Sequence, residues 1–243
     1  MLHAEHGGGN NSTFTCRVLS SAGTDSYAAY SAAIGSLKGV RHGGANLKVC
    51  KMISEIENNV EDITDEKQVK AYLEKIINKE AGDGTGLIYG MGHAVYTLSD
   101  PRAVILKRKA KEFSKGTEFE KEFNLIDMIE RFTPELFRKI KGVNKPLCAN
   151  VDLYSGLVYK ILGIPEDIFT PLFAAARIVG WSAHRMEEIL TGNRIIRPAY
   201  KSVAIPKKYI PIDERIENYN ASTAYIPTEE RFMIQGEDGN DEN

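Results

Sequence analysis

Hydrophobic residues recur at helical spacing in nearly every long segment of this chain, and this periodicity constrains the fold more than any other sequence feature. The segment after Asp65 is typical, because its aliphatic residues fall on one helical face. No repeat at solenoid spacing is apparent. A few stretches look extended, and all are too short for a sheet that organises a fold: residues 87–89, 95–97 and 195–196. The sequence therefore predicts an all-α fold.

Residues that favour helix N-caps mark the starts of the predicted helices. Asp100 precedes Pro101, which suits the first helical position, and this helix should run to about Phe113. The longest clear helix should run from Thr170 to near Gly192. Other predicted starts are Asp25, Gly44, Asp65 and a capping box of Thr117 and Glu120. The helix after Asp25 is expected to turn one face inward, formed by Tyr27, Tyr30, Ile34 and Leu37.

Composition excludes several classes of protein. With 42% hydrophobic residues in 243, the chain can bury a substantial core. It has neither an apolar run long enough for a membrane span nor a signal-peptide pattern, so we expect a cytoplasmic protein without a membrane partner. A net charge of -2 argues against nucleic acid as the main partner. Cys16, Cys50 and Cys148 lack the spacing of a disulfide framework or zinc site.

The C-terminal part has a different character. Past Ser202, isoleucine-proline pairs punctuate an irregular stretch, and residues 229–243 hold mainly acidic charges. We expect the proline-anchored part to dock on protein surface and the acidic end to have no chemical role.

The segment from Gly90 to Arg102 concentrates residues suited to binding an oxyacid. Gly90 and Gly92 flank His93 and let the backbone approach a ligand closely. Arg102 should project from the first turn of a helix, where unpaired amides and the helix dipole favour an anion. The alternative is a glycine-rich loop whose histidine and arginine are merely exposed.

Other segments also place one unusual polar residue among glycines or small residues. They are His3–Asn10, Arg41–Asn46, Asn150–Gly156, Phe173–Trp181 and Arg197-Pro198. Taken in this order, the chain resembles the citrate synthase family from residue 1 to about residue 200. The positions that match the family signature are Gly90, Gly92, His93, Val95, Asp100, Pro101 and Arg102.

The resemblance implies condensation of acetyl-CoA with oxaloacetate, giving citrate and CoA, as in the tricarboxylic acid cycle. Asp152 matches the family's catalytic base, and its apolar neighbours should raise its pKa. The residue pattern alone leaves another interpretation open, in which Asp152 caps a helix that begins near Tyr154. His42 matches the donor to the enolate oxygen, and its place before a helix start should keep its ring neutral. His93 matches the residue that polarises the attacked carbonyl.

The resemblance also implies how the substrates bind. Arg102, Arg177 and His6 match contacts to oxaloacetate, and arginine suits planar recognition of carboxylates. Arg197 matches a residue that reaches the partner's site, which implies a homodimer. Lys145 lies where some members bind the phosphates of coenzyme A. Thr97 and Met91 depart from the family pattern, so the coenzyme A match is weaker there; His3 matches a supporting histidine. The chemistry requires no metal and no permanently bound cofactor, since acetyl-CoA is a co-substrate.

The fold implied by the resemblance is a small helical domain, residues 44–163, inserted in a large one represented by residues 1–43 and 164–243. Because the match begins directly on the substrate motif, we expect the C-terminal part of such an enzyme. Three functions stay open. The chain belongs to a citrate synthase, to a 2-methylcitrate synthase that uses propionyl-CoA, or to a non-catalytic helical binding or dimerisation domain. The two enzymes differ by one methylene in the acyl group, which the sequence does not resolve.

Overall fold

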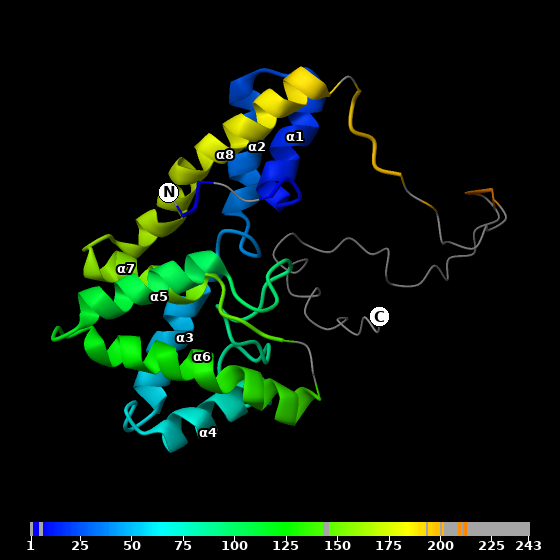
Figure 1. Ribbon diagram of the computed structural model, residues 1–243. Helices are drawn as coiled ribbons and strands as arrows, with labels where there is room; N and C mark the ends of the chain where they lie inside the picture. Colours follow the sequence, from blue (N-terminus) through cyan, green and yellow to red (C-terminus); the bar gives the residue numbers. More distant parts are fainter. Residues whose placement is uncertain are drawn as a thin grey trace. The chain divides into compact units, whose positions relative to one another are not determined.

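The computed structural model describes residues 2–4, 7–142, 146–192, 194–199, 201, 209, 211 and 212. It divides the chain into two compact units, Met1–Arg197 and Pro198–Asn243. The described part of the first unit is helical, as predicted, and contains no β-strand (Figure 1). Its elements are α1 (Asn11–Ser21), α2 (Ser26–Lys38), α3 (Ala45–Asn59), α4 (Glu66–Ile77), α5 (Pro101–Ser114), α6 (Glu120–Lys141), α7 (Val151–Ile161), the 3-10 helix η1 (Glu166–Ile168) and α8 (Phe169–Thr191).

Helices of the first unit share hydrophobic cores in two groups. Helices α1, α2 and α8 enclose a small core around the fully buried Trp181. Helices α3 to α7 enclose a larger core that runs from Val49 to Val158. Cys50, Tyr159 and Phe169 form a third cluster where α3, α7 and the start of α8 meet. The predicted domain division at residues 43 and 163 stays a prediction.

Residues that favour N-caps correctly predicted where most of the helices begin. The side chains of Asp25, Asp65 and Asp100 cap α2, α4 and α5, each accepting a hydrogen bond from a backbone N–H of the first turn. These bonds are 2.8 to 3.0 Å long. Acceptors at this position satisfy amides that have no partner within the helix.

Two expectations about local structure were wrong in whole or in part. On the predicted inner face of α2, Leu37 is buried and Tyr30 packs against the core, whereas the side chains of Tyr27 and Ile34 are 86% and 43% exposed; Ala29 and Ala33 are buried instead. At α6 the N-cap is Phe119, whose side chain cannot accept a hydrogen bond, and Glu120 accepts from the Gly116 amide instead of closing a capping box. The segments 87–89, 95–97 and 195–196 form no strand, in keeping with the expectation that they are too short to build a sheet. Outside them, Met91 and Ala149 form an isolated antiparallel bridge.

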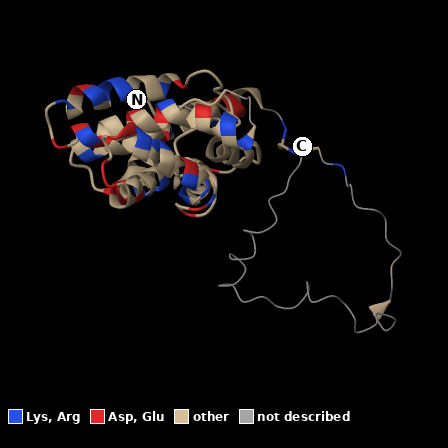
Figure 2. Ribbon diagram, turned by 90° about the horizontal axis from the view of Figure 1, so that it is seen from below, with Lys and Arg blue, Asp and Glu red and all other residues tan. Residues whose placement is uncertain are grey.

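Basic and acidic residues are interspersed along the helices in the view of Figure 2. Several pair across helices: Lys107 of α5 lies 2.7 Å from both Asp127 and Glu130 of α6. None of the described helices is long and apolar enough to cross a membrane. The acidic end at residues 229–243 lies outside the described residues.

Candidate functional site

A cavity of about 120 Å³ joins residues from both helix groups. Its walls include most of the residues that the sequence singled out for function: His42, His93, Arg102, Asp152 and Arg177. These side chains come from the turn before α3, the loop before α5 and the helices α5, α7 and α8. The fold therefore brings together positions that are widely separated along the chain.

Asp152 is the second residue of α7, and the helix is capped by Asn150. The interpretation of Asp152 as the helix cap was therefore wrong. Among the described residues, no N–H or O–H group donates a hydrogen bond to its carboxylate, and burial raises its pKa to about 6. Arg102 and Arg177 oppose that shift. The group is poised to lose and regain a proton near neutral pH.

The raised pKa of Asp152 makes a testable contribution to stability. An aspartate in an unfolded chain has a pKa near 3.9, so the native state binds this proton more tightly. On this account the free energy of unfolding falls by up to about 3 kcal/mol as pH rises from about 4 to about 7. Asp152→Asn should therefore stabilise the fold at pH 7.5 and leave it unchanged at pH 4. Urea unfolding of both proteins at each pH measures this, and equal differences at the two pH values would contradict it.

His42 is held neutral within the site. Burial lowers the pKa of its ring, and the positive charge of Arg177 lowers it further. Its Nε2 lies 3.1 Å from the hydroxyl of Ser12, which lies 2.8 Å from the Asn10 side-chain oxygen. The chain Asn10–Ser12–His42 fixes the ring. The Ser12 hydroxyl has one proton, which it donates either to Asn10 or to Nε2 of His42; when it donates to Nε2, the proton of the neutral ring sits on Nδ1, which can then act as a hydrogen-bond donor.

The tautomer of His93 follows from its backbone contacts. Its Nδ1 accepts hydrogen bonds from the amides of Val95 and Tyr96, both 3.0 Å away. The proton of the neutral ring therefore sits on Nε2, which lies 3.3 Å from Nη2 of Arg102. Burial and Arg102 both lower the pKa of His93, so the ring stays neutral. Nε2 of His93 and Nη2 of Arg102 thus lie side by side at the cavity, where one oxygen atom could accept hydrogen bonds from both.

Two guanidinium groups supply positive charge. Arg102 is held by the carboxylate of Asp100, which accepts from Nε at 3.0 Å and from Nη2 at 2.7 Å. Arg177 is 1% exposed, donates from Nε to the His3 carbonyl at 3.3 Å and lies over the Phe173 ring at 4.4 Å. Buried arginines in such a setting are suited to binding an anion.

Other predicted residues lie elsewhere. Arg197 is exposed and does not line the cavity. His6 and Lys145 lie outside the described residues. His3 is buried against Tyr159, whose hydroxyl is 2.5 Å from its Nε2, and burial lowers its pKa to about 4. No group of three or more His, Cys, Asp or Glu is placed to hold a metal ion in the part of the chain that the structure describes.

Sequence reasoning gave no role to several residues of the cavity wall. Asn10, Asn46, Asn150 and Thr170 all line it, and Asp100 was interpreted only as a helix cap. Each of the three asparagines stands in a segment already noted for its small residues, and an amide there was a signal for hydrogen bonding near a ligand.

Comparisons with known proteins identify the family of this chain. The family model for the C-terminal domain of citrate synthase matches residues 1–199. Citrate synthase 2 of Bacillus subtilis is 43% identical over 216 residues, covering 88% of this chain and 52% of the relative. A 2-methylcitrate synthase of Shewanella oneidensis is 36% identical over 217 residues, covering 88% and 52%.

Structural similarity extends to citrate synthase of Thermoplasma acidophilum, solved in a ternary complex with carboxymethyl coenzyme A and oxaloacetate. The TM-score is 0.70 with 33% identity, over 88% of this chain and 53% of that chain. The chain thus spans about half the length of these relatives. With the family model matching most of its length and the fold shared, the chain belongs to the citrate synthase family.

Proposed function

We propose that this chain carries the condensing site for acetyl-CoA and oxaloacetate, giving citrate and CoA. One observation carries the proposal: a single cavity is lined by a carboxyl group with a raised pKa, two neutral histidines and two buried guanidinium groups. This proposal includes a role in the tricarboxylic acid cycle and a cytoplasmic location.

The charges of the cavity suit a dicarboxylate. Arg102 and Arg177 provide two positive groups, and the histidines stay neutral because burial and these arginines lower their pKa values. Asp100 neutralises part of the charge of Arg102, which lines the cavity beside His93. An oxaloacetate carboxylate and keto oxygen could accept hydrogen bonds from Arg102 and His93.

The proposed reaction gives a separate role to Asp152, His42 and His93. The Asp152 carboxylate removes a proton from the acetyl methyl group while His42 donates a hydrogen bond to the thioester oxygen. The carbon of the resulting enolate attacks the keto carbon of oxaloacetate, which His93 polarises, and a carbon–carbon bond forms as the carbonyl π electrons move to the keto oxygen. That oxygen takes up one proton and becomes a hydroxyl group, and Asp152 releases the proton that it removed, so the number of protons is unchanged. Water finally cleaves the thioester, which releases CoA as a thiol.

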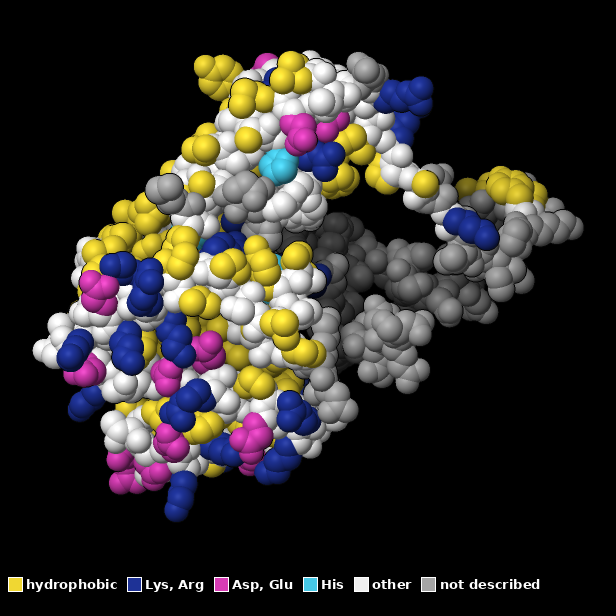
Figure 3. Space-filling model, viewed as in Figure 1, with side chains coloured by type: hydrophobic (Ala, Val, Ile, Leu, Met, Phe, Trp, Pro, Cys, Tyr) yellow, Lys and Arg dark blue, Asp and Glu magenta, His cyan; other side chains and the backbone are white. Residues whose placement is uncertain are grey.

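Further partners complete the proposal. Arg197, exposed in this chain, is proposed to reach the site of a second copy in a homodimer, and Lys145 to contact coenzyme A. Hydrophobic side chains gather along the edge of the molecule where α8 runs (Figure 3). Val179, Ile189 and Leu190 of α8 are 67%, 57% and 82% exposed, so this helix has apolar surface for another polypeptide segment to cover.

The alternatives rest on separate observations. The similarity to the 2-methylcitrate synthase of Shewanella oneidensis supports the alternative in which propionyl-CoA is the co-substrate, with the same residues in the same roles. The half-length match to the relatives favours a chain that binds oxaloacetate without turning it over alone.

A thiol-release assay separates these functions. Oxaloacetate is supplied with acetyl-CoA or propionyl-CoA to the chain alone and to a chimera that adds the remaining part of the Bacillus subtilis relative. We expect CoA release from the chimera, faster with acetyl-CoA. Faster release with propionyl-CoA would favour 2-methylcitrate synthase. Absence of release from both forms, with oxaloacetate binding retained in calorimetry, would overturn the catalytic proposal and assign a binding domain.

A further inference from the structure

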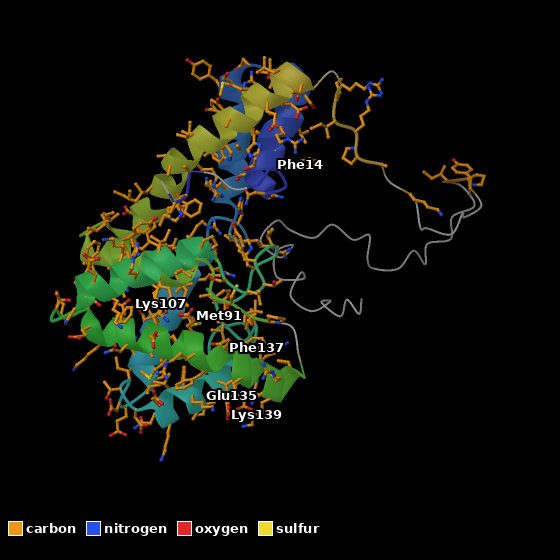
Figure 4. All side chains as sticks on the ribbon, viewed as in Figure 1. Phe14, Met91, Lys107, Glu135, Phe137 and Lys139 are labelled. Atoms are coloured by element: carbon orange, nitrogen blue, oxygen red, sulfur yellow. The ribbon has the colours of Figure 1, made fainter. Side chains whose placement is uncertain are left out.

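The loop that carries His93 and the start of α7 are joined by a short antiparallel pairing. The Gly92 amide donates to the Cys148 carbonyl at 2.7 Å, and the Asn150 amide donates to the Gly90 carbonyl at 2.9 Å. These bonds flank the bridge between Met91 and Ala149, and Met91 is labelled in Figure 4. The two segments therefore hold a fixed register.

The side chain of Asn150 reinforces this pairing with both ends of its amide group. Its Nδ2 donates to the Gly92 carbonyl at 2.9 Å, one bond away from the backbone nitrogen of His93. Its Oδ1 accepts from the amide of Asp152 at 2.9 Å. One side chain thus bonds to the backbone of Asp152 and to the residue that precedes His93.

We propose that Asn150 is a positioning residue that fixes Asp152 relative to His93. This inference rests on the proposed function, in which both groups act on the same pair of substrates. Neither arm of the amide has to touch a substrate, because each acts through the backbone of a neighbouring residue.

Helix capping alone does not explain why this position has asparagine and not aspartate, since either residue can cap a helix. The other helices with side-chain caps, α2, α4 and α5, use aspartate, which supplies the acceptor that a cap requires. At position 150 an aspartate would place a carboxylate oxygen against the Gly92 carbonyl and a second negative charge beside Asp152. The amide of asparagine supplies the same acceptor together with a donor, and that donor holds the loop.

Close packing supports the same conclusion. Gly90 has a φ of +82°, and a Cβ at this residue would lie 2.8 Å from Cδ1 of Leu153 in the first turn of α7. The backbone at Gly90 therefore packs directly against the turn that carries Asp152.

The test compares variants that separate capping from tethering. Asn150→Ala removes both side-chain hydrogen bonds. Asn150→Ser keeps a capping oxygen, but its side chain is too short to reach the Gly92 carbonyl. Asp65→Ala removes the matching cap from α4, which does not line the cavity, and serves as the control. Each protein is labelled with ¹³C at its aspartate carboxyl groups. The Asp152 signal, assigned with Asp152→Asn, is titrated by NMR, and oxaloacetate affinity and thermal unfolding are measured alongside.

We expect Asn150→Ser to unfold near the wild-type temperature while the pKa of Asp152 falls from about 6 by roughly one unit, because water reaches the carboxylate once the loop is released. Oxaloacetate affinity should fall as well. Asp65→Ala should lower the unfolding temperature and move neither quantity. A wild-type pKa and affinity in Asn150→Ser would overturn the proposal, and so would equal changes in Asp65→Ala. The titration requires no turnover, so its outcome is independent of the thiol-release assay, and Asn150→Ser still decides the matter if Asn150→Ala does not fold.

Discussion

Replacement of Asp152 by Asn is expected to lower the rate constant for CoA release by about 10² to 10⁴-fold, the usual contribution of a general base. The amide keeps the size of the side chain but cannot accept the methyl proton. Oxaloacetate should bind at least as well, because the change removes a negative charge near Arg102 and Arg177. Rates come from thiol release by the active form of the protein, and affinity comes from calorimetry.

The pH profile supplies an internal check on this role. Since the pKa of Asp152 is about 6, the wild-type rate should fall as pH drops below that value and the base becomes protonated. The residual activity of Asp152→Asn should lack this acid limb. Asp65→Asn, at the cap of α4, is the matched control and should keep the wild-type rate and profile. Turnover at the wild-type rate in Asp152→Asn would refute the assignment of this residue as the base.

Replacement of Asp100 by Ala is expected to lower the free energy of unfolding by about 3 kcal/mol, as for other buried ion pairs that lose one partner. The side chain of Asp100 is 0% exposed and that of Arg102 is 11% exposed, so the remaining guanidinium would stay largely buried without its carboxylate. The same change removes the cap of α5. Urea unfolding at pH 7.5, followed by circular dichroism, measures the loss.

An exposed ion pair between α4 and α6 provides the control for Asp100→Ala. Glu135 lies 2.9 Å from Lys70 of α4, and their side chains are 63% and 34% exposed. Glu135 and Lys139 are labelled on the C-terminal half of α6 in Figure 4. Because water screens such pairs, Glu135→Ala should change the free energy of unfolding by less than about 1 kcal/mol. Comparable losses in the two variants would show that burial of the Asp100–Arg102 pair has no special weight.

Sequence patterns correctly predicted features that depend only on residues close by in the chain. The caps at Asp25, Asp65 and Asp100 are confirmed because a cap needs only an acceptor beside the first turn of its own helix. The buried face of α2 was predicted only in part, because it depends on what the helix packs against. Leu37 is buried as predicted, but the small Ala29 and Ala33 fit the core around Trp181, and Tyr27 and Ile34 stay exposed.

The candidate site shows the same limit. The family resemblance predicted which residues lie together in one site. Five of them line the same cavity: His42, His93, Arg102, Asp152 and Arg177. Their roles are still proposals.

Sequence could not predict how these groups are held. The proton on Nε2 of His93 is set by two amides of a loop whose shape the sequence does not specify. The double contact of Asn150 requires the His93 loop to lie beside α7, which is a property of the assembled fold.

The pairing between Met91 and Ala149 has a consequence for the order in which this protein folds. Gly92 and Asn150 are 58 residues apart, and the chain between them contains α5 and α6. Closing so long a loop costs chain entropy that a few hydrogen bonds cannot offset in an unfolded chain. Packing of α5 and α6 shortens the effective loop and offsets that cost. Folding intermediates that have not yet packed these two helices would therefore lack the cavity, so the capacity to bind substrate emerges late in folding.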